Sequence, residues 1–537
     1  MGSAGHPEPK SMLDLGSKAM ESEKRLGNPF RSGREMIQIQ VGKAGSGMGH
    51  EFLRDLVEEH AIEYENDDLR GTFFGDDFSR EQHVDVFFNE GKPHKASGRH
   101  RWVPRCVLVD LNMQDLAQIT SGPLGHLYRP ENICGNDNGS GNNFGQAFNT
   151  EGPDVADDAL DIIRKEAEKA NCLQGIQFTH SISGGTGSGL MSLLLRTLSE
   201  YFQGKVGHDV LFQNFALVPC PNFHDIVVEP YNAILAMKEL NEFSDQIFVY
   251  DNCALSKIVQ NTLKSGTPKM QELNNVVALC MSGITSGMRF KGPLNADLRK
   301  MNQNLVPFKG LNLLCSSFAP LDSAESVSYR HVSVLDLAQQ MLQRNNITCT
   351  CEPQWENHDR TDMSKKPQSR ILAAWAAWRG HFRTQEVDRI LYDMLKEGSR
   401  FDRFFPDWVP NTIASNMCAQ PHCEKKDSVV FIANNTSIVD VLRHSGDIFD
   451  RMYKQNSFVH TFAENGVEEE DLRGARNHVR DLVSAYESKA RLPDSLKEIL
   501  GDGDEGAEAS IVREYEELAK KQLMEIVLAK ETKPRRR

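Results

Sequence analysis

The segment that most constrains the fold is SISGGTGSG, residues 181–189, which places four glycines in nine positions. A glycine inside a regular element costs roughly 0.5–1 kcal/mol relative to alanine, so such a cluster needs a physical reason. GIQFTHS (175–181) before it reads as a strand, and GLMSLLLRTLSEYF (189–202) after it reads as a helix. Glycines at a strand-to-helix junction let main-chain N–H groups cradle a phosphate, and Thr186 and Ser188 add hydroxyl donors. The alternative is a flexible surface turn.

Two more glycine-rich segments favour the phosphate interpretation. VGKAGSGMG (41–49) follows the strand-like MIQIQVG and is followed by MGHEFLRDLVEEH (48–60), which predicts an amphipathic helix after a glycine-rich turn. NGSGNNFG (138–145) is the third segment. No GxxxxGK[ST] loop occurs, and a dinucleotide fingerprint starting at Gly45 fails at His50. Three such loops at strand ends predict a phosphate-bearing ligand at the carboxyl edge of one sheet.

Strand-like and helix-like segments alternate from about residue 36 over about 230 residues, which predicts an α/β layer with a mostly parallel sheet. In the second half, GLNLLCSSF (310–318), RILAAWAAWRG (370–380) and DSVVFIANNTS (427–437) read as strands of another sheet. Residues 459–490 have helical periodicity, and residues 509–530 predict a further amphipathic helix before a basic end, KPRRR.

The composition sets limits on the class of protein. With 537 residues, 39% hydrophobic and 25% charged, the chain is long enough for two or three globular domains. No run approaches the roughly 18 apolar residues of a membrane span, and the first residues do not form a secretory signal. The net charge of −14 argues against general nucleic-acid binding. Eleven scattered cysteines fit reduced thiols in a cytosol-like compartment.

At this point a family resemblance is visible. SGGTGSG resembles the tubulin signature GGGTGSG, with Ser183 replacing the first glycine, and other segments resemble tubulin in tubulin order: REMIQIQVGKAG, WVPRCVLVDL, SGPLGHLYRPEN, SGNNF, CLQGIQFTHS, VVEPYNAIL, LNADLRKMNQNLVPF and NNTS. The resemblance covers about residues 34–490 and misses both ends and stretches near 62–82, 91–100 and 355–366. VVEPYNA and LNADLRK are nearest to beta-tubulin, whereas AILAMKELNE also resembles epsilon-tubulin, so the subfamily stays open between beta and specialised epsilon or theta types.

The resemblance implies a site for GTP or GDP. Carried over by position, the loops at 42–44, 141–142 and 184–187 would hold phosphates, Asp225 and Glu229 the ribose, and Asn252 and Asn274 the guanine edge. Met270 stands where the family has a tyrosine that stacks on guanine. The implied nucleotide-binding residues are Gly42, Lys43, Ala44, Asn142, Ser181, Gly184, Gly185, Thr186, Gly187, Asp225, Glu229, Asn252, Met270 and Asn274.

The chain departs from the family beside the expected phosphates. Lys43 replaces a glutamine, and Asn112 replaces a glutamate on the Mg²⁺ side. A carboxylate is therefore lost and an ammonium gained, so Mg²⁺ is expected only at an altered site. One hypothesis is that Lys43 partly replaces Mg²⁺ as the counter-charge; the alternative is a drifted site with weakened binding.

The resemblance also bears on hydrolysis and assembly. In LNADLRK, Lys300 stands where alpha-tubulin supplies a glutamate to its neighbour's nucleotide. An ammonium is a poor base, so no catalytic residue is assigned, and we expect at most a weak GTPase that needs a partner's glutamate. Tyr329 and Arg330 are retained in the loop 320–330, which would make lateral contacts.

The sequence therefore predicts the tubulin fold: a Rossmann-like GTPase domain, a second α/β domain with a mixed sheet, and C-terminal helices. The expected divisions are a mobile extension (1–33), a GTP-binding domain (34–240), a core helix and linking region (241–290), an intermediate domain with an insertion near 355–366 (291–455), C-terminal helices (456–500), and a linker, amphipathic helix and basic tail (501–537).

The predicted function is that of a divergent beta-like tubulin, a structural constituent of microtubules. Its expected partners are an alpha-like tubulin, lattice neighbours and microtubule-associated proteins, with no nucleic acid and no membrane span. Its expected place is the cytoplasmic cytoskeleton, with a cilium, axoneme or basal body as specialised arrays. Two alternatives stay open: a centriolar or adaptor tubulin of the epsilon type outside the lattice, and a free-standing GTPase.

Overall fold

The computed structural model describes residues 34–490, except for residues 67, 76, 94–98, 205–209, 220–225, 265–267, 295, 322–331, 351–368, 397–403, 407–411 and 423–426. The expected N-terminal extension, the insertion near 355–366, the lateral-contact residues Tyr329 and Arg330, and the C-terminal linker, helix and basic tail lie outside the described residues. The domain boundaries given above stay predictions.

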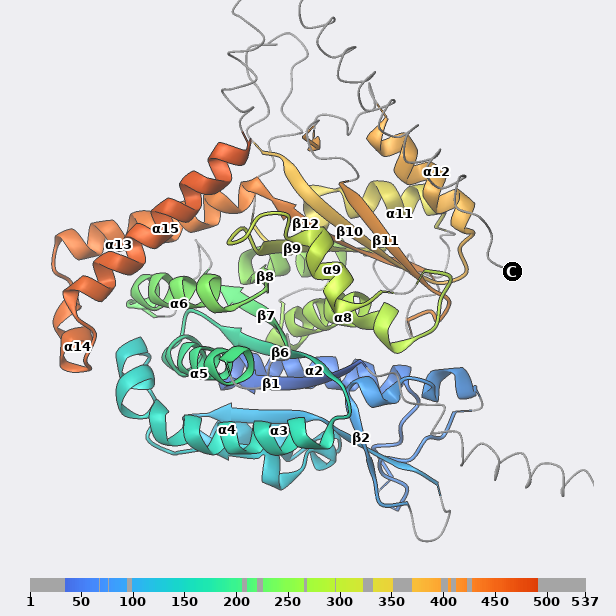
Figure 1. The fold of residues 1–537 in the computed structure, drawn as a ribbon, viewed down its shortest axis with the longest axis horizontal. Helices are drawn as coiled ribbons and strands as arrows, with labels where there is room; N and C mark the ends of the chain where they lie inside the picture. Colours follow the sequence, from blue (N-terminus) through green and yellow to red (C-terminus); the bar gives the residue numbers. More distant parts are fainter. Residues whose placement is uncertain are drawn as a thin grey trace, which may run out of the picture. The chain divides into compact units, whose positions relative to one another are not determined.

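Strands and helices alternate along the first half, as predicted (Figure 1). The strands are β1 Glu35–Val41, β2 Phe88–Gly91, β3 Arg101–Pro104, β4 Cys106–Asp110, β5 Ile133–Gly135, β6 Leu173–Ser181, β7 Leu211–Val218, β8 Gln246–Asp251, β9 Leu313–Ala319, β10 Ile371–Arg379, β11 Ile413–Cys418 and β12 Ser428–Asn435. The α-helices are α2 Gly42–Glu59, α3 Met113–Thr120, α4 Gly152–Lys169, α5 Met191–Gly204, α6 Glu229–Phe243, α7 Asn252–Lys257, α8 Met270–Arg289, α9 Leu298–Leu305, α11 Val334–Met341, α12 Thr384–Leu395, α13 Val439–Lys454, α14 Val459–Glu464 and α15 Glu469–Ala490.

Within the described residues, ten strands form one sheet in the order β11-β10-β12-β9-β8-β7-β6-β1-β4-β5. The strands from β5 to β9 are parallel, β12 is antiparallel to both β9 and β10, and β11 is parallel to β10. The α/β fold with a mostly parallel sheet is therefore confirmed. The strands expected in a separate second sheet instead continue the first one, because β8 pairs with β9 at Ile247 and Leu313.

A large apolar core joins helices α2 and α8 to the sheet. Phe52 and Leu56 of α2 and Met281 of α8 pack in one buried cluster with Leu108 of β4 and Phe248 of β8. Helices α4, α5 and α6 pack one against the next, and α13 packs on α6 (Figure 1). The core therefore fixes α2, which carries the first glycine-rich segment, against both the sheet and the long helix α8.

A buried ionic cluster anchors the last turn of α2. The Glu59 carboxylate accepts hydrogen bonds from Arg289 of α8 at 2.5 Å and Arg379 of β10 at 2.7 Å. It also accepts one from Ser282 at 2.6 Å, and His422 Nε2 lies 3.3 Å away. Burial alone would raise the pKa of Glu59, but Arg289, Arg379, His422 and Ser282 together hold the pKa well below its ordinary value. The carboxylate therefore stays ionised and ties α2 to two distant elements.

The cysteines only partly match the expectation of reduced thiols. Seven cysteines in the described residues are not in a disulfide: Cys106, Cys134, Cys172, Cys280, Cys315, Cys349 and Cys418. Cys253, in the first turn of α7, is disulfide-bonded. The expectation is therefore wrong at this residue, because the odd number and spread of cysteines could not reveal which pair the fold brings together.

Candidate functional site: a cradle of three glycine-rich loops

The three glycine-rich segments meet at the ends of neighbouring strands. Gly42 has φ +73°, and a Cβ placed on it would lie 3.5 Å from the main-chain nitrogen of Gly187. A Cβ placed on Gly185 would lie 2.5 Å from Ser140 Oγ, and Ser140 Oγ is 3.3 Å from Thr186 Oγ1. We call residues 42–44, 140–143 and 184–187 the cradle. Its close backbone approaches explain why glycine is needed at several of its positions.

The first segment is not a turn that precedes a helix, contrary to expectation. Helix α2 begins at Gly42, directly after β1, so the glycines at 45, 47 and 49 lie inside its first turns. A side chain on Gly45 would overlap the Thr179 carbonyl oxygen, and one on Gly49 would overlap the Gln40 side chain. These glycines are tolerated despite their low helix propensity because they let the helix lie tightly against β6 and β1.

Asn232, which the sequence reasoning did not single out, joins two of the loops. Its Nδ2 donates to the carbonyl oxygens of Asn142 at 2.8 Å and Ser183 at 3.0 Å, and its Oδ1 accepts from the Phe144 main chain at 3.0 Å. Asn232 is fully buried on α6. Asn142 itself has φ +57°, so this carbonyl is held in the left-handed region. The only available signal was an amide in a mostly apolar stretch, VVEPYNAIL.

The 184–187 loop enters its helix through a π-helical turn, Thr186–Leu190, before α5 begins at Met191. His180 Nδ1 lies 3.0 Å from the Gly187 carbonyl, and Ser188 Oγ donates to the Gly184 carbonyl at 2.5 Å. Burial lowers the pKa of His180 to about 4, so the ring is neutral at pH 7 and its Nδ1–H donates to Gly187. Ser181 Oγ accepts from the Ser183 main chain at 3.3 Å. Single-turn π-helices often occur at functional sites.

The residues expected around the sugar and base lie at helix starts. Glu229 opens α6 and is buried, Asn252 opens α7, and Met270 opens α8 with 60% of its surface exposed. Asn274 faces α2, since its Nδ2 lies 2.9 Å from a Cβ placed on Gly47. Asp225 lies outside the described residues. The structure therefore places Asn274 next to α2, the helix whose first residues form one of the three cradle loops.

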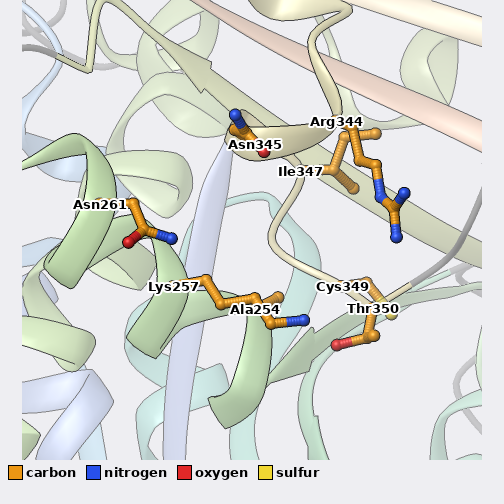
Figure 2. Close-up of a pocket in the computed structure, with 8 residues that line it drawn as sticks. All are labelled: Ala254, Lys257, Asn261, Arg344, Asn345, Ile347, Cys349 and Thr350. Carbon is orange, nitrogen blue, oxygen red and sulfur yellow. The ribbon is translucent and has the colours of Figure 1, made fainter. Parts of the chain in front are cut away.

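A separate small pocket lies beside α7, which contributes Ala254 and Lys257 to its lining (Figure 2). It has a volume of about 70 Å³ and is lined by Ala254, Lys257, Asn261, Arg344, Asn345, Ile347, Cys349 and Thr350. Thr350 Oγ1 donates to the Asp251 carboxylate, which also caps α7 through the Cys253 main chain. None of the residues expected to bind nucleotide lines this pocket, so it is not part of the cradle.

At the rim of the cradle, the two residues that depart from the family pattern share one partner. Lys43 Nζ lies 3.0 Å from Asp115 Oδ1, and Asn112 Nδ2 donates to Asp115 Oδ2 at 2.9 Å. Asn112 Oδ1 caps α3 by accepting from the Gln114 main chain at 3.1 Å. Burial and the Asp115 carboxylate raise the pKa of nearby Asp110 to about 7. The sequence reasoning identified Lys43 and Asn112 but missed Asp115.

The residues at this rim fit Mg²⁺ poorly. Both oxygens of Asp115 and both polar atoms of Asn112 are engaged, which leaves Asp110 Oδ2 as an acceptor without a hydrogen-bond partner among the described residues. At a nucleotide site Mg²⁺ is usually held by one or two protein carboxylates together with phosphates and waters, and the Lys43 ammonium repels a second cation at Asp115.

Lys300 and Asp297 lie at the start of α9. Asp297 precedes the helix and accepts a hydrogen bond from Gln174, while Lys300 is exposed in the first turn. The exposed position is compatible with contact to a neighbouring chain, but no catalytic carboxylate is present at residue 300.

Comparison with known proteins gives the class. The model of the Tubulin/FtsZ family, GTPase domain, matches residues 35–260, and that of the tubulin C-terminal domain matches residues 311–446. The chain therefore belongs to the tubulin family, whose GTPase domain implies binding of GTP or GDP.

Two relatives illustrate the degree of divergence. The chain is 37% identical over 477 residues to a tubulin beta-3 chain of an Oomycete-like species (strain MacKay2000), which covers 88% of this chain and 100% of the relative. It is 38% identical over 454 residues to the nucleomorph tubulin beta chain of Guillardia theta, covering 84% and 96%. The family resemblance seen in the sequence is therefore confirmed. Among the described helices, none combines the length and apolar character needed to cross a bilayer.

Proposed function

We propose that this chain is a divergent beta-like tubulin subunit that binds GTP in the cradle and pairs with an alpha-like tubulin. The observation that carries the proposal is the meeting of the three glycine-rich loops, two of which are joined by the Asn232 side chain. Its beta-chain relatives support the beta-like assignment.

We further propose that hydrolysis of its GTP depends on a neighbouring subunit. A polymer of this chain alone would place Lys300, an ammonium, where a carboxylate is needed to orient water. An alpha-like partner would supply that carboxylate. This asymmetry favours a heterodimer over a free-standing GTPase, and it makes the isolated chain nearly inert as an enzyme.

The deciding experiment is co-expression with a conventional alpha-tubulin, followed by sedimentation of the dimer and of polymers formed with GTP. Heterodimer formation and copolymerisation would support the lattice role, whereas GTP binding without entry into dimer or polymer would favour the centriolar or adaptor role. Expression of a tagged chain would show whether it joins general cytoplasmic microtubules or a cilium, axoneme or basal body.

A further inference from the structure

The side chain of Lys43 is placed to reach the cradle from its rim. Lys43 is the second residue of α2, directly after Gly42, whose backbone approaches Gly187. The side chain is 74% exposed, and its ammonium is held by Asp115, which is 20% exposed. The ammonium group lies on a flexible four-carbon stem with three rotatable donors, so it can turn from one acceptor to another close by.

The Lys43–Asp115 ion pair is weak enough for the ammonium to leave Asp115 for another acceptor. Ion pairs between solvent-exposed side chains contribute only about 0–1 kcal/mol. A triphosphate in the cradle would present several negative charges to the same ammonium, whereas Asp115 presents one, and Coulomb attraction grows with the charge of the partner. Lys43 would therefore favour the phosphates over Asp115 once a nucleotide is bound.

The neighbouring side chains offer few free ligand atoms to a divalent ion that would neutralise the phosphates in place of Lys43. Asn112 caps α3 with its Oδ1 and donates to Asp115 with its Nδ2. The two carboxylate oxygens of Asp115 are thus occupied by Asn112 and by Lys43. We propose that Lys43 is a built-in counter-cation for the nucleotide polyphosphate, held ready by Asp115, so that retention of GTP by this chain depends only weakly on Mg²⁺. This inference rests on the proposed GTP binding.

The test measures bound guanine nucleotide per chain after exchange of the full-length protein into buffer with Mg²⁺ or with EDTA. The affinity of the wild type for GTP should be less than about threefold lower in EDTA than in Mg²⁺. Lys43→Gln should lose about tenfold or more in EDTA, the equivalent of one charge-assisted hydrogen bond. Lys43→Arg should behave like the wild type, because it keeps the charge.

Two further variants separate the proposed role from a general effect of charge. Lys454→Gln removes an exposed lysine at the end of α13 and should leave retention unchanged in both buffers. Asp115→Asn releases Lys43 and should keep or increase GTP affinity in EDTA. Because Lys43 is exposed, we expect every variant to keep the unfolding temperature of the wild type within a few degrees.

The outcomes distinguish the inference from the function on which it rests. If the wild type binds GTP with Mg²⁺ and loses it in EDTA as completely as Lys43→Gln, the inference is wrong and the proposed function stands. If the wild type binds no guanine nucleotide in either buffer, the proposed function fails and the inference fails with it.

Discussion

The side-chain amide of Asn232 lies 2.8 Å from the main-chain carbonyl of Asn142 and fixes that residue at φ +57°. The same amide reaches Ser183, so one buried side chain sets the spacing of two cradle loops. Asn232→Ala would remove three hydrogen bonds and leave buried main-chain groups unsatisfied, at about 1–3 kcal/mol each. We expect at least a tenfold loss of GTP affinity, measured by equilibrium titration with a fluorescent GTP analogue.

Glu242→Ala serves as the matched control for Asn232→Ala, since Glu242 is exposed on the same helix. It should bind the analogue like the wild type. Equal affinity of Asn232→Ala and Glu242→Ala would show that the two loops keep their spacing without the amide.

Two glycines of the cradle region should differ in their tolerance of the same substitution to alanine. A methyl group on Gly45 would overlap the Thr179 carbonyl, whereas one on Gly184 would meet nothing within 4 Å. Overpacking against a sheet costs about 1–3 kcal/mol or more because neither the helix nor the strand can move freely. Gly45→Ala should therefore lower the unfolding temperature clearly in a thermal melt.

Gly184→Ala should leave that melt nearly unchanged, and any effect should be confined to nucleotide binding. A normal melt for Gly45→Ala would mean that α2 can shift away from β6, contrary to the close packing in the structure.

The Glu59 cluster predicts a large effect far from the cradle. Glu59→Gln would leave Arg289 and Arg379, both almost fully buried, without their shared carboxylate. Removing one partner of a buried ion pair costs about 3–5 kcal/mol. We expect strongly reduced soluble yield and a lower midpoint of chemical denaturation. Glu63→Gln is the comparison, since Glu63 lies in the loop after α2 and is part-exposed; it should denature close to the wild type.

Much of the fold could be predicted because it depends on local patterns. The alternation of apolar strands with amphipathic helices indicated the parallel sheet, and the three glycine-rich segments indicated where strands end at a ligand site. The start of α2 could not be predicted, because Gly42 to Gly49 have poor helix propensity and become helical only through contact with β6 and β1.

The missed site residues share one physical cause. Asn232 contacts Asn142, 90 residues away in sequence, and Asp115 contacts Lys43, 72 residues away, so the sequence did not show that they belong to the site. The short strand β11 and the β2–β3 hairpin were also missed, since β11 is stabilised mainly by pairing with β10. Contacts of this kind depend on tertiary structure, which overrides weak local signals.

Two buried histidines predict that the protein becomes less stable as the pH falls below 6.5. Burial, with Arg289 nearby, lowers the pKa of His60 to about 3, and burial lowers that of His180 to about 4. Between pH 6.5 and these values the unfolded chain binds protons that the folded chain does not, so the free energy of unfolding falls with pH. At pH 5 each histidine should cost about 2 kcal/mol relative to pH 7.

His60→Gln removes one of these groups and can keep a hydrogen bond to the Arg80 carbonyl, which His60 Nδ1 contacts at 2.6 Å. Denaturation at pH 7 and pH 5 should show a smaller pH-dependent loss in this variant, by about 2 kcal/mol. His381→Gln, at an exposed site, should show the wild-type loss. An identical loss in all three proteins would contradict the assignment of the effect to His60.

A substitution at Lys300 tests directly the proposal that GTP hydrolysis requires a carboxylate from the neighbouring subunit. Lys300→Glu would place a carboxylate in the exposed first turn of α9, where the wild-type ammonium cannot orient a water molecule. In polymers where this chain contacts the nucleotide of its neighbour, phosphate release should rise by about 100-fold, the lower end of the range for positioned general bases. Gln303→Glu also places a carboxylate on α9, but further along the helix, and should release phosphate at the wild-type rate. Equal rates for Lys300→Glu and Gln303→Glu in sedimented polymers would mean that α9 does not face a neighbouring nucleotide, and the lattice role proposed for this chain would lose its catalytic argument.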